Sequence, residues 1–254
     1  MIITYKIQIG IKKDKCDDSA LIGSRVVNDE MGDLKIDTTG KVFISDGVGG
    51  NAGGDEASLF VMNQLSDLTL DESNEIIKAR LLSVNDALIE YAKSISGHES
   101  MATTITGLIF ENNRVVLAHC GNTRIYALQG SFLKQVTSDQ TTYQWLLDKG
   151  QDEIAEHCNK SEIRGAFGGG TSKFADTLIV NNIFEKGFPR KILMTSDGIH
   201  DVLDIDEIED IVTDESMISK DKVNRLVSLA VEKGSQDDCT AVLIETEEDI
   251  GDKN

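Results

Sequence analysis

One pattern occurs twice in this chain and limits how it can fold. Residues 42–48 (VFISDGV) and residues 192–199 (ILMTSDGI) are both apolar runs that end in Ser-Asp-Gly and an aliphatic residue. A short apolar run that ends at turn residues is typical of a buried strand. Four more glycines in residues 49–54 predict a loop that can approach another group closely, followed by a helix to about Leu68. The pattern therefore predicts two carboxylates, Asp46 and Asp197, at one end of a sheet.

Apolar periodicity predicts the other elements. Alternation from Ile3 to Ile11 predicts an amphipathic strand, and three- and four-residue spacing predicts a long helix over residues 73–96. Further strands are expected at residues 103–110, 114–120, 124–128, 132–136, 177–183, 191–195 and 239–245, and further helices at 143–149, 206–212 and 221–233. Residues 16–30 are interpreted as a polar loop, and residues 151–173 as a mobile, glycine-containing insert.

Consecutive hairpins with paired long helices predict an α+β fold in which antiparallel sheets are flanked by helices. No linker-like segment divides the chain, so we expect one domain over residues 1–246, followed by a short acidic tail at residues 247–254.

The net charge of the chain limits the classes of partner that it can bind. The formal net charge is −19, from 44 acidic and 25 basic residues, which argues against nucleic acid or an anionic membrane as the main partner. No apolar run approaches the ~18 residues of a membrane span. No leader is visible at the N-terminus, and the four cysteines form no CxxC pair. These observations predict a reduced, cytoplasmic protein that concentrates cations.

Acidic residues beside predicted strands indicate a metal site. The positions are Asp29 (with Glu30), Asp46, Asp197 and Asp237 (with Asp238). Carboxylate oxygens suit Mg²⁺ or Mn²⁺, and Gly47 could add its backbone carbonyl. Two such ions ~3.5–4 Å apart can activate a shared water for in-line attack on phosphorus. A single Asp-Gly after a strand is more simply explained as an ordinary turn. The metal-site hypothesis therefore rests on the repetition of acidic residues beside several predicted strands.

Eight short motifs, in order over nearly the whole chain, resemble those of the metal-dependent protein serine/threonine phosphatases of the PP2C (PPM) family. Residues 25–30 (RVVNDE) resemble its RxxNED with the acids swapped, 46–50 (DGVGG) its DGMGG or DGHGG, 101–104 (MATT) its GTT, and 121–126 (GNTRIY) its GDSRxY. Residues 136–139 (VTSD) resemble LTxDH, 164–168 (RGAFG) resemble TRALG, 196–201 (SDGIHD) resemble SDGLxD, and 235–238 (SQDD) resemble SRDN.

The resemblance implies a four-layer α-β-β-α sandwich of two antiparallel sheets with helices outside. It implies hydrolysis of phosphoserine and phosphothreonine in proteins, opposite a serine/threonine kinase, with two Mn²⁺ or Mg²⁺ ions. Asp46 would bridge both ions and Gly47 would lend its carbonyl; Asp197 and Asp237 would complete one ion, and Asp29 the other. Arg25 would bind the substrate phosphate. Three further residues are expected to contact the metal ligands without binding the metal themselves: Glu30, Asn122 and Asp238.

Two positions depart from the family pattern. Asn122 stands where bacterial relatives have an aspartate that helps to bind a third metal. An amide is a poorer ligand for a hard cation, so a third site is expected to be weak or absent. Val48 stands where some relatives have a histidine that protonates the leaving group. A water molecule would have to protonate the leaving group instead, so the rate of hydrolysis is expected to be modest.

Three alternative interpretations remain open. Asn122 and the swapped acids Asp29 and Glu30 are compatible with a degenerate family member that binds phosphoproteins or regulates a partner. Cys158 and Arg164 have the HCx5R spacing of cysteine-dependent phosphatases, although neither a glycine-containing loop nor a buried strand accompanies them. Residues 47–52 match the GxGxxA dinucleotide fingerprint, but a second long helix follows where a parallel strand is needed.

Overall fold

The structure is a computed structural model that describes all residues except 38, 49–51, 70–71, 112–113, 186 and 247–254. The predicted acidic tail therefore lies outside the described residues. Among the residues that are described, none of the helices combines the length and apolar character that crossing a membrane requires.

Both ends of the chain contribute to one six-stranded sheet, called sheet A. Its strand order is β10 (Phe132–Gln135), β9 (Arg124–Gln129), β13 (Lys191–Thr195), β14 (Cys239–Glu245), β1 (Ile2–Gln8) and β4 (Met31–Lys35). Each neighbouring pair is antiparallel. Because β13 and β14 run in opposite directions, the residues that follow β13 lie beside the residues that precede β14.

A second six-stranded sheet, called sheet B, uses the middle of the chain. Its order is β12 (Ile179–Ile183), β8 (Arg114–Cys120), β7 (Ile105–Glu111), β5 (Gly40–Asp46), β2 (Asp18–Ile22) and β3 (Arg25–Val27), again antiparallel throughout. A two-stranded sheet pairs β6 (Ala102–Thr103) with β11 (Phe167–Gly168).

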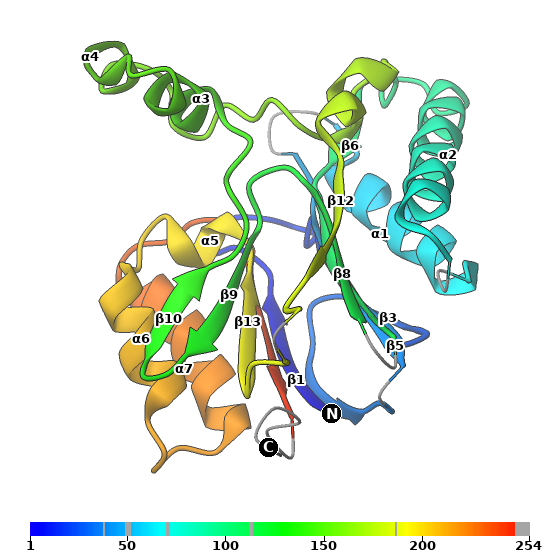
Figure 1. The fold of residues 1–254 in the computed structure, drawn as a ribbon. Coiled ribbons are helices and arrows are strands. Elements are labelled where there is room, and N and C mark those ends of the chain that lie inside the picture. Colours follow the sequence, from blue (N-terminus) through cyan, green and yellow to red (C-terminus); the bar gives the residue numbers. More distant parts are fainter. Residues whose placement is uncertain (38, 49–51, 70–71, 112–113, 186, 247–254) are drawn as a thin grey trace.

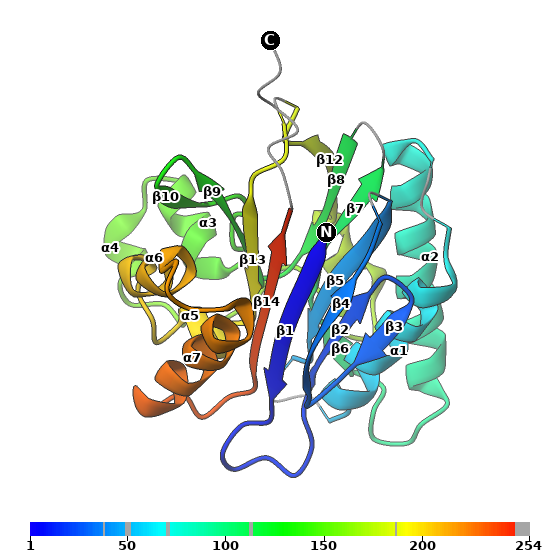
Figure 2. The same cartoon turned by 90° about the horizontal axis from the view of Figure 1, so that it is seen from below.

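Helices cover the outer face of each sheet. Sheet B is covered by α1 (Gly54–Asp67) and α2 (Asn74–Lys93), and sheet A by α5 (Asp197–His200), α6 (Ile205–Thr213) and α7 (Ser219–Glu232). Figure 2 shows the two sheets face to face between these helix layers. The predicted α+β fold, a four-layer α-β-β-α sandwich, is therefore confirmed.

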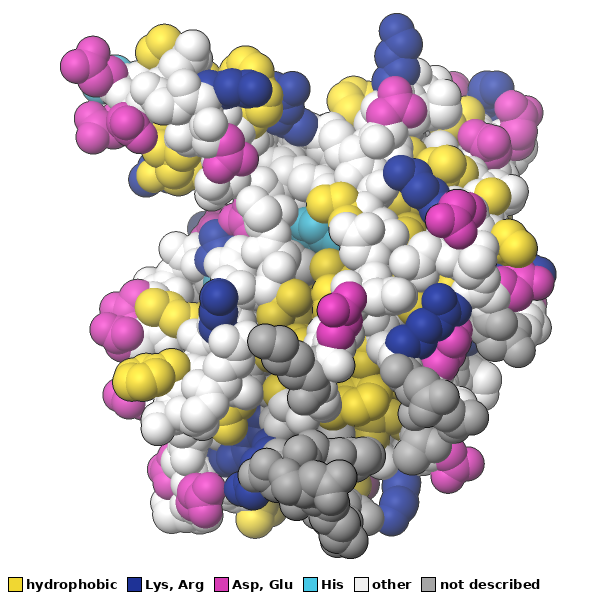
Figure 3. Space-filling view, in the orientation of Figure 1, with side chains coloured by type: hydrophobic (Ala, Val, Ile, Leu, Met, Phe, Trp, Pro, Cys, Tyr) yellow, Lys and Arg dark blue, Asp and Glu magenta, His cyan; other side chains and the backbone are white. Residues whose placement is uncertain are grey.

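Residues 142–177, called the insert, contain α3 (Thr142–Asp148), α4 (Asp152–Ala155), β11 and the 3-10 helix η1 (Ser172–Thr177). They leave the four layers at α3 and α4 and return to them at β11 and η1, which contact α2. In Figure 1, α3 and α4 project from the end of the sandwich where α5 lies, and the N-terminus is at the other end. Figure 3 shows a hollow between this projection and the body of the molecule.

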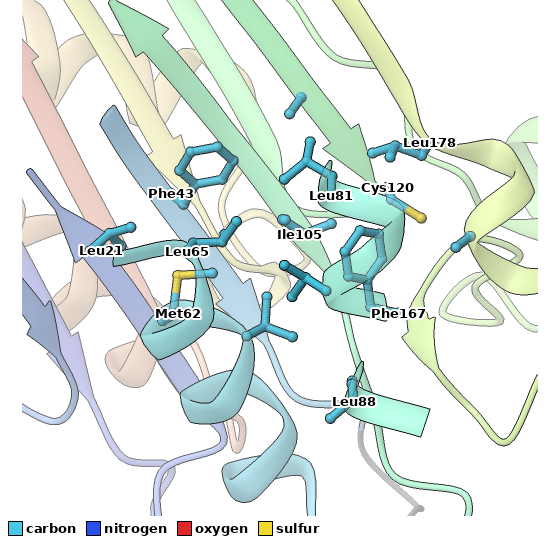
Figure 4. Packing of buried hydrophobic residues seen from close by; sticks show 14 of the residues in the cluster. Leu21, Phe43, Met62, Leu65, Leu81, Leu88, Ile105, Cys120, Phe167 and Leu178 are labelled. Carbon is cyan, nitrogen blue, oxygen red and sulfur yellow. The ribbon is translucent and has the colours of Figure 1, made fainter. Parts of the chain in front are cut away.

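Three apolar cores match the layers. The first lies between sheet B and helices α1 and α2; Figure 4 shows it, with Phe43 and Ile105 from the sheet and Met62 and Leu65 from α1. The second fills the space between the sheets, and the third lies between sheet A and helices α6 and α7. Because both faces of β5 and β7 are covered, these strands are nearly continuously buried, which explains their unbroken apolar sequence.

The structure differs from the sequence prediction near the N-terminus. Residues 16–30 contain β2 and β3 and are not a polar loop, because the run from Ser19 to Ile22 is wholly buried between neighbouring layers. The first strand ends at Gln8, so Ile11 lies beyond it with 57% of its surface exposed. The other predicted strands and helices are present, with shifts of one to three residues at most ends.

Replacing Gly107 by alanine should destabilise the protein. Gly107 pairs with Phe43 across β7 and β5, and an added Cβ would lie 2.1 Å from a ring carbon of that buried phenylalanine. Such overpacking costs about 1–3 kcal/mol, which thermal unfolding would register as a lower Tm. Gly40→Ala is the matched control, because its Cβ would meet only the end of the Ile36 side chain, at 3.2 Å. Equal Tm values for both variants would contradict the prediction.

Candidate functional site

Aspartates from both sheets meet at one end of the sandwich. Asp46 is the last residue of β5 and Asp18 the first of β2, and the two are direct partners in the strand register. Asp197 opens α5 just after β13, and Asp237 and Asp238 precede the neighbouring β14. With Asp17, these six aspartates form what we call the acidic edge.

A hydroxyl group joins the two sheets at the acidic edge. The Oγ1 of Thr240, on β14 of sheet A, donates a hydrogen bond of 2.6 Å to Asp18 Oδ2, on β2 of sheet B. Both residues are buried. This contact fixes the distance between the sheets where the carboxylates converge.

Hydrogen bonds to both the carbonyl and the N–H fix the backbone of Asp46. Its carbonyl accepts hydrogen bonds from Thr103 Oγ1 at 2.9 Å and from the Thr104 N–H at 2.8 Å, and its own N–H donates to Thr104 Oγ1 at 3.0 Å. Gly47 follows in close contact with the start of α1, where an added Cβ would lie 2.5 Å from the Gly54 carbonyl. A glycine is therefore required at position 47, which keeps the backbone there uncovered by a side chain.

Burial and mutual repulsion raise the pKa values of these carboxyl groups. Burial is the main cause for Asp46, whose pKa is raised well above its ordinary value, and the nearby Asp197, Asp18 and Asp237 add to it. The pKa of Asp197 is raised by burial and by Asp237. Burial, followed by the charge of Asp238, raises the pKa of Asp18 to about 7. The protein therefore holds negative charges together against their own repulsion.

Lys13 lies among the same carboxylates. Its Nζ atom is 3.0 Å from Asp17 Oδ2, 2.5 Å from Asp237 Oδ1 and 2.9 Å from Asp238 Oδ2. Burial lowers the pKa of Lys13, but hydrogen bonds to the three carboxylates outweigh it and raise the pKa overall. Within the described part of the chain, Lys13 is the basic side chain that ion-pairs with the acidic edge, so one positive charge faces six aspartates.

The acidic edge fits hard divalent cations. Its ligand atoms are carboxylate oxygens, and Asp18 Oδ1 is buried without a hydrogen-bond partner in the described part of the chain. In the described residues no three His, Cys, Asp or Glu side chains are close enough together to enclose an ion.

The structure brings several predicted site residues together. Asp46, Gly47, Asp197 and Asp237 lie at the acidic edge, as described above. Asn122 is buried beside them and donates from Nδ2 to Asp197 Oδ2 at 3.0 Å. Asp238 is also buried, and its two oxygens accept from the N–H groups of Gly10 and Asp17, both at 2.7 Å. Through these two hydrogen bonds, Asp238 connects the β1–β2 loop to the start of β14.

Three predicted residues lie elsewhere. Arg25 pairs with Ile22, at the opposite end of β2 from Asp18 and so about 13 Å along the strand. Its guanidinium contacts Glu30 at 2.9 Å, and both side chains are partly exposed. Asp29 is exposed and accepts from the Ile9 N–H at 3.0 Å. The assignment of Arg25 to phosphate and of Asp29 to metal therefore lacks the required proximity to Asp46.

The sequence prediction missed Lys13, Asp17 and Asp18. The available signal was the same one that identified Asp46: two acids stand directly at the end of the run Ser19 to Ile22, which becomes β2. The run is short and begins with small residues, so its sequence lacks the clear apolar pattern of a strand.

The alternative sites lack supporting geometry. Cys158 follows α4 in a depression also lined by Glu153 and Glu156, whose charges would repel a phosphate. Arg164 stacks on the Trp145 ring, 4.4 Å from its centroid, rather than facing the cysteine. A dinucleotide-binding unit requires a parallel strand after α1, but α2 follows, and the strand pairings of the described residues are antiparallel.

Comparison with known proteins identifies similar chains. No protein-family model matches. Protein phosphatase PhpP of Streptococcus pneumoniae serotype 2 (strain D39) is 30% identical over 217 residues, which cover 82% of this chain and 86% of PhpP. A crystal structure of a bacterial serine phosphatase carrying one substitution has a TM-score of 0.80 at 25% identity and covers 99% of both chains. The catalytic domain of serine threonine protein phosphatase PstP, crystallised with two manganese ions, has a TM-score of 0.73 at 24% identity over 96% of this chain and 99% of that one.

Replacing Asp18 by asparagine should stabilise the protein in the absence of metal. The pKa of Asp18 is about 7 in the folded protein and about 3.9 in an unfolded chain, so the folded state retains a proton that the unfolded state releases. Stability should therefore fall as pH rises from about 4 through 7. Asparagine does not titrate, so Asp18→Asn should have a higher Tm at pH 8 and a weaker pH dependence. It should also lose most of the Tm increase that Mn²⁺ gives the wild type.

Thermal unfolding from pH 5 to pH 8, with and without Mn²⁺, checks this. Asp29→Asn is the matched control, because Asp29 is exposed outside the acidic edge. An Asp18→Asn protein with the pH dependence and Mn²⁺ response of the wild type would contradict the prediction.

Proposed function

The chain belongs to the PP2C (PPM) family of metal-dependent protein serine/threonine phosphatases, and we propose that it hydrolyses phosphoserine and phosphothreonine in proteins at the acidic edge. The convergence of six aspartates from distant segments at one end of both sheets carries this proposal. A binding module without catalysis would not require such a concentration of negative charge, so the degenerate-member alternative is less well supported.

Two divalent cations, Mn²⁺ or Mg²⁺, are the proposed cofactors. When bound, they would lower the pKa of a water molecule and neutralise charge on the phosphoryl group. Asp46 and Gly47 stand at the end of β5 in sheet B, and Asp197 and Asp237 adjoin β13 and β14 of sheet A. Asp18, which has an oxygen without a partner among the described residues, is proposed for the metal-binding role expected of Asp29 from the motif. PstP, of similar fold, is known with two manganese ions, in agreement with this number.

Lys13 is the proposed phosphate-binding residue, in the role expected of Arg25 from the motif. Its ammonium borders a cavity of about 450 Å³ that is also lined by Asp197 and Asp237. Cations at the carboxylates would compete with Lys13 for the same oxygens. An ammonium released from Asp237 in this way can bind phosphoryl oxygens as a point charge.

Asn122 argues for two ions rather than three. Its amide nitrogen faces Asp197, so it orients that carboxylate and offers no negative charge to a further cation. Val48 follows Gly47, and its N–H donates to the Ala102 carbonyl at 2.9 Å. An aliphatic side chain has no proton to give, so protonation of the leaving group falls to water.

The proposed substrates are phosphorylated proteins, and the opposing enzyme is a serine/threonine kinase. Ser161 of the insert borders the same cavity as Lys13, so residues that flank the phosphorylated side chain should contact the insert. Residues 1–246 are proposed to act as a single phosphatase domain in the cytoplasm.

Hydrolysis of p-nitrophenyl phosphate tests the proposed function. We expect activity that requires Mn²⁺ or Mg²⁺, is abolished by chelation, and falls by about three orders of magnitude in Asp46→Asn. A phosphothreonine peptide should show the same dependence. Cys158→Ser is the control and should retain full activity. Activity that survives chelation but is lost in Cys158→Ser would instead establish the thiolate mechanism.

Substitution of Lys13 should separate substrate binding from folding. With Mn²⁺ present, Lys13→Ala should raise KM for p-nitrophenyl phosphate at least about tenfold, because a charge-assisted contact to phosphate is lost. Without substrate it should bind Mn²⁺ more tightly, because a competing cation is removed. Calorimetric titration measures the second effect.

Arg25→Ala removes the same charge outside the acidic edge and is the matched control. Its KM and Mn²⁺ affinity should stay within about twofold of wild type, as for other surface substitutions. A larger KM increase in Arg25→Ala than in Lys13→Ala would overturn the assignment of Lys13.

A further inference from the structure

Asn85 is a buried polar side chain in an apolar core. It lies on α2, has 0% of its surface exposed, and is surrounded by the core between α2 and sheet B, to which its helix neighbours Leu81, Val84 and Leu88 belong. Its Oδ1 accepts a hydrogen bond of 2.8 Å from the Gly168 N–H, and its Nδ2 has no partner among the residues that the structure describes. An unpaired buried amide group costs stability, so an apolar residue would suit this core better than asparagine.

The partner of Asn85 belongs to the segment that anchors the insert. Gly168 is in β11, where it pairs with Ala102 of β6, and it has a φ of +86°. An added Cβ at Gly168 would lie 2.3 Å from the Met101 carbonyl oxygen, so the two backbones are in close contact. Phe167, on the same short strand, is buried in the core that Figure 4 shows. Asn85 therefore holds the backbone of β11 at a point where little displacement is possible.

The other side of β6 contacts the end of β5. The Ala102 carbonyl accepts from the Val48 N–H at 2.9 Å, and Thr103 forms a bridge with Gly47. Thr103 Oγ1 also donates to the Asp46 carbonyl, as described above. β6 thus lies between the anchor of the insert and the backbone of two proposed metal-binding residues. A displacement of β11 would be transmitted to Asp46 and Gly47 through one two-residue strand.

We propose that Asn85 is a positioning residue, which fixes β11 against β6 and thereby sets both the Asp46–Gly47 backbone and the base of the insert. This rests on the function proposed above. The unpaired Nδ2 is what distinguishes positioning from ordinary packing: the side chain supplies an acceptor for Gly168 while leaving its own amide unsatisfied. Because the insert also borders the cavity of Lys13, one hydrogen bond influences the two surfaces that meet the substrate.

Two variants of Asn85 separate the hydrogen bond from the volume of the side chain. Asn85→Leu keeps the branched shape and the number of heavy atoms but offers Gly168 no acceptor, whereas Asn85→Asp keeps an acceptor oxygen. At pH 6 the buried aspartate should be largely protonated, because burial raises the pKa of a carboxyl group. Val84→Ala, one position earlier in α2 and in the same core, is the matched control for loss of packing alone.

Hydrogen exchange of the metal-free protein is the first measurement. Exchange in peptides that cover residues 166–170 should become about tenfold faster in Asn85→Leu and stay near wild type in Asn85→Asp and Val84→Ala. Calorimetry should then show Mn²⁺ binding weakened about tenfold in Asn85→Leu, with kcat for p-nitrophenyl phosphate reduced by a similar factor. Val84→Ala should lower Tm at unchanged Mn²⁺ affinity.

Three results would overturn the proposal. They are wild-type exchange and Mn²⁺ affinity in Asn85→Leu, equal losses in Asn85→Leu and Asn85→Asp, and equal losses in Asn85→Leu and Val84→Ala. Hydrogen exchange and metal titration do not depend on catalysis. A wild type without phosphatase activity would therefore refute the proposed function while leaving the exchange measurement to decide the role of Asn85.

Discussion

Repulsion between carboxylates that cannot move apart is the constraint on which the site depends. Asp46 and Asp18 face each other because the register of β5 and β2 places them there, and neither can retreat without breaking strand pairing. Burial raises the pKa values of both, and nearby charges add to it: those of Asp197 and Asp18 at Asp46, and those of Asp238 and Asp197 at Asp18. Three apolar cores and two antiparallel sheets supply the rigidity that holds the groups in place. The fold thus maintains an excess of negative charge that additional cations would relieve.

The hydrogen bonds that support the carboxylates come mainly from neutral groups. Threonine hydroxyls hold the Asp46 backbone and the Asp18 side chain, and the Asn122 amide holds Asp197. A neutral donor orients a carboxylate oxygen without supplying a positive charge. The negative charge of the carboxylate therefore remains available to bind a cation. Cationic donors at the same positions would have stabilised the carboxylates and weakened any metal that followed.

The sequence located Asp46 and Asp197 because β5 and β13 are buried on both faces and therefore stand out as apolar runs. It did not locate Asp18, because β2 is short and its pairing with β5 is a long-range feature that no local pattern encodes. The similarity of residues 25–30 to a family motif favoured Arg25 and Asp29. In the structure, Arg25 pairs with Ile22, at the opposite end of β2 from Asp18. A motif match cannot predict this position, because it contains no information on strand register.

Lys13 differs from the carboxylates around it in how freely it can move. The acidic edge is fixed by strand register and by hydrogen bonds, whereas Lys13 lies between β1 and β2 and reaches Asp17, Asp237 and Asp238 through a flexible four-carbon side chain. Displacing its ammonium requires rotation about single bonds and leaves both sheets unchanged. A mobile positive charge beside fixed negative charges can therefore neutralise part of the site in the absence of metal and transfer to a phosphoryl group when cations occupy the carboxylates.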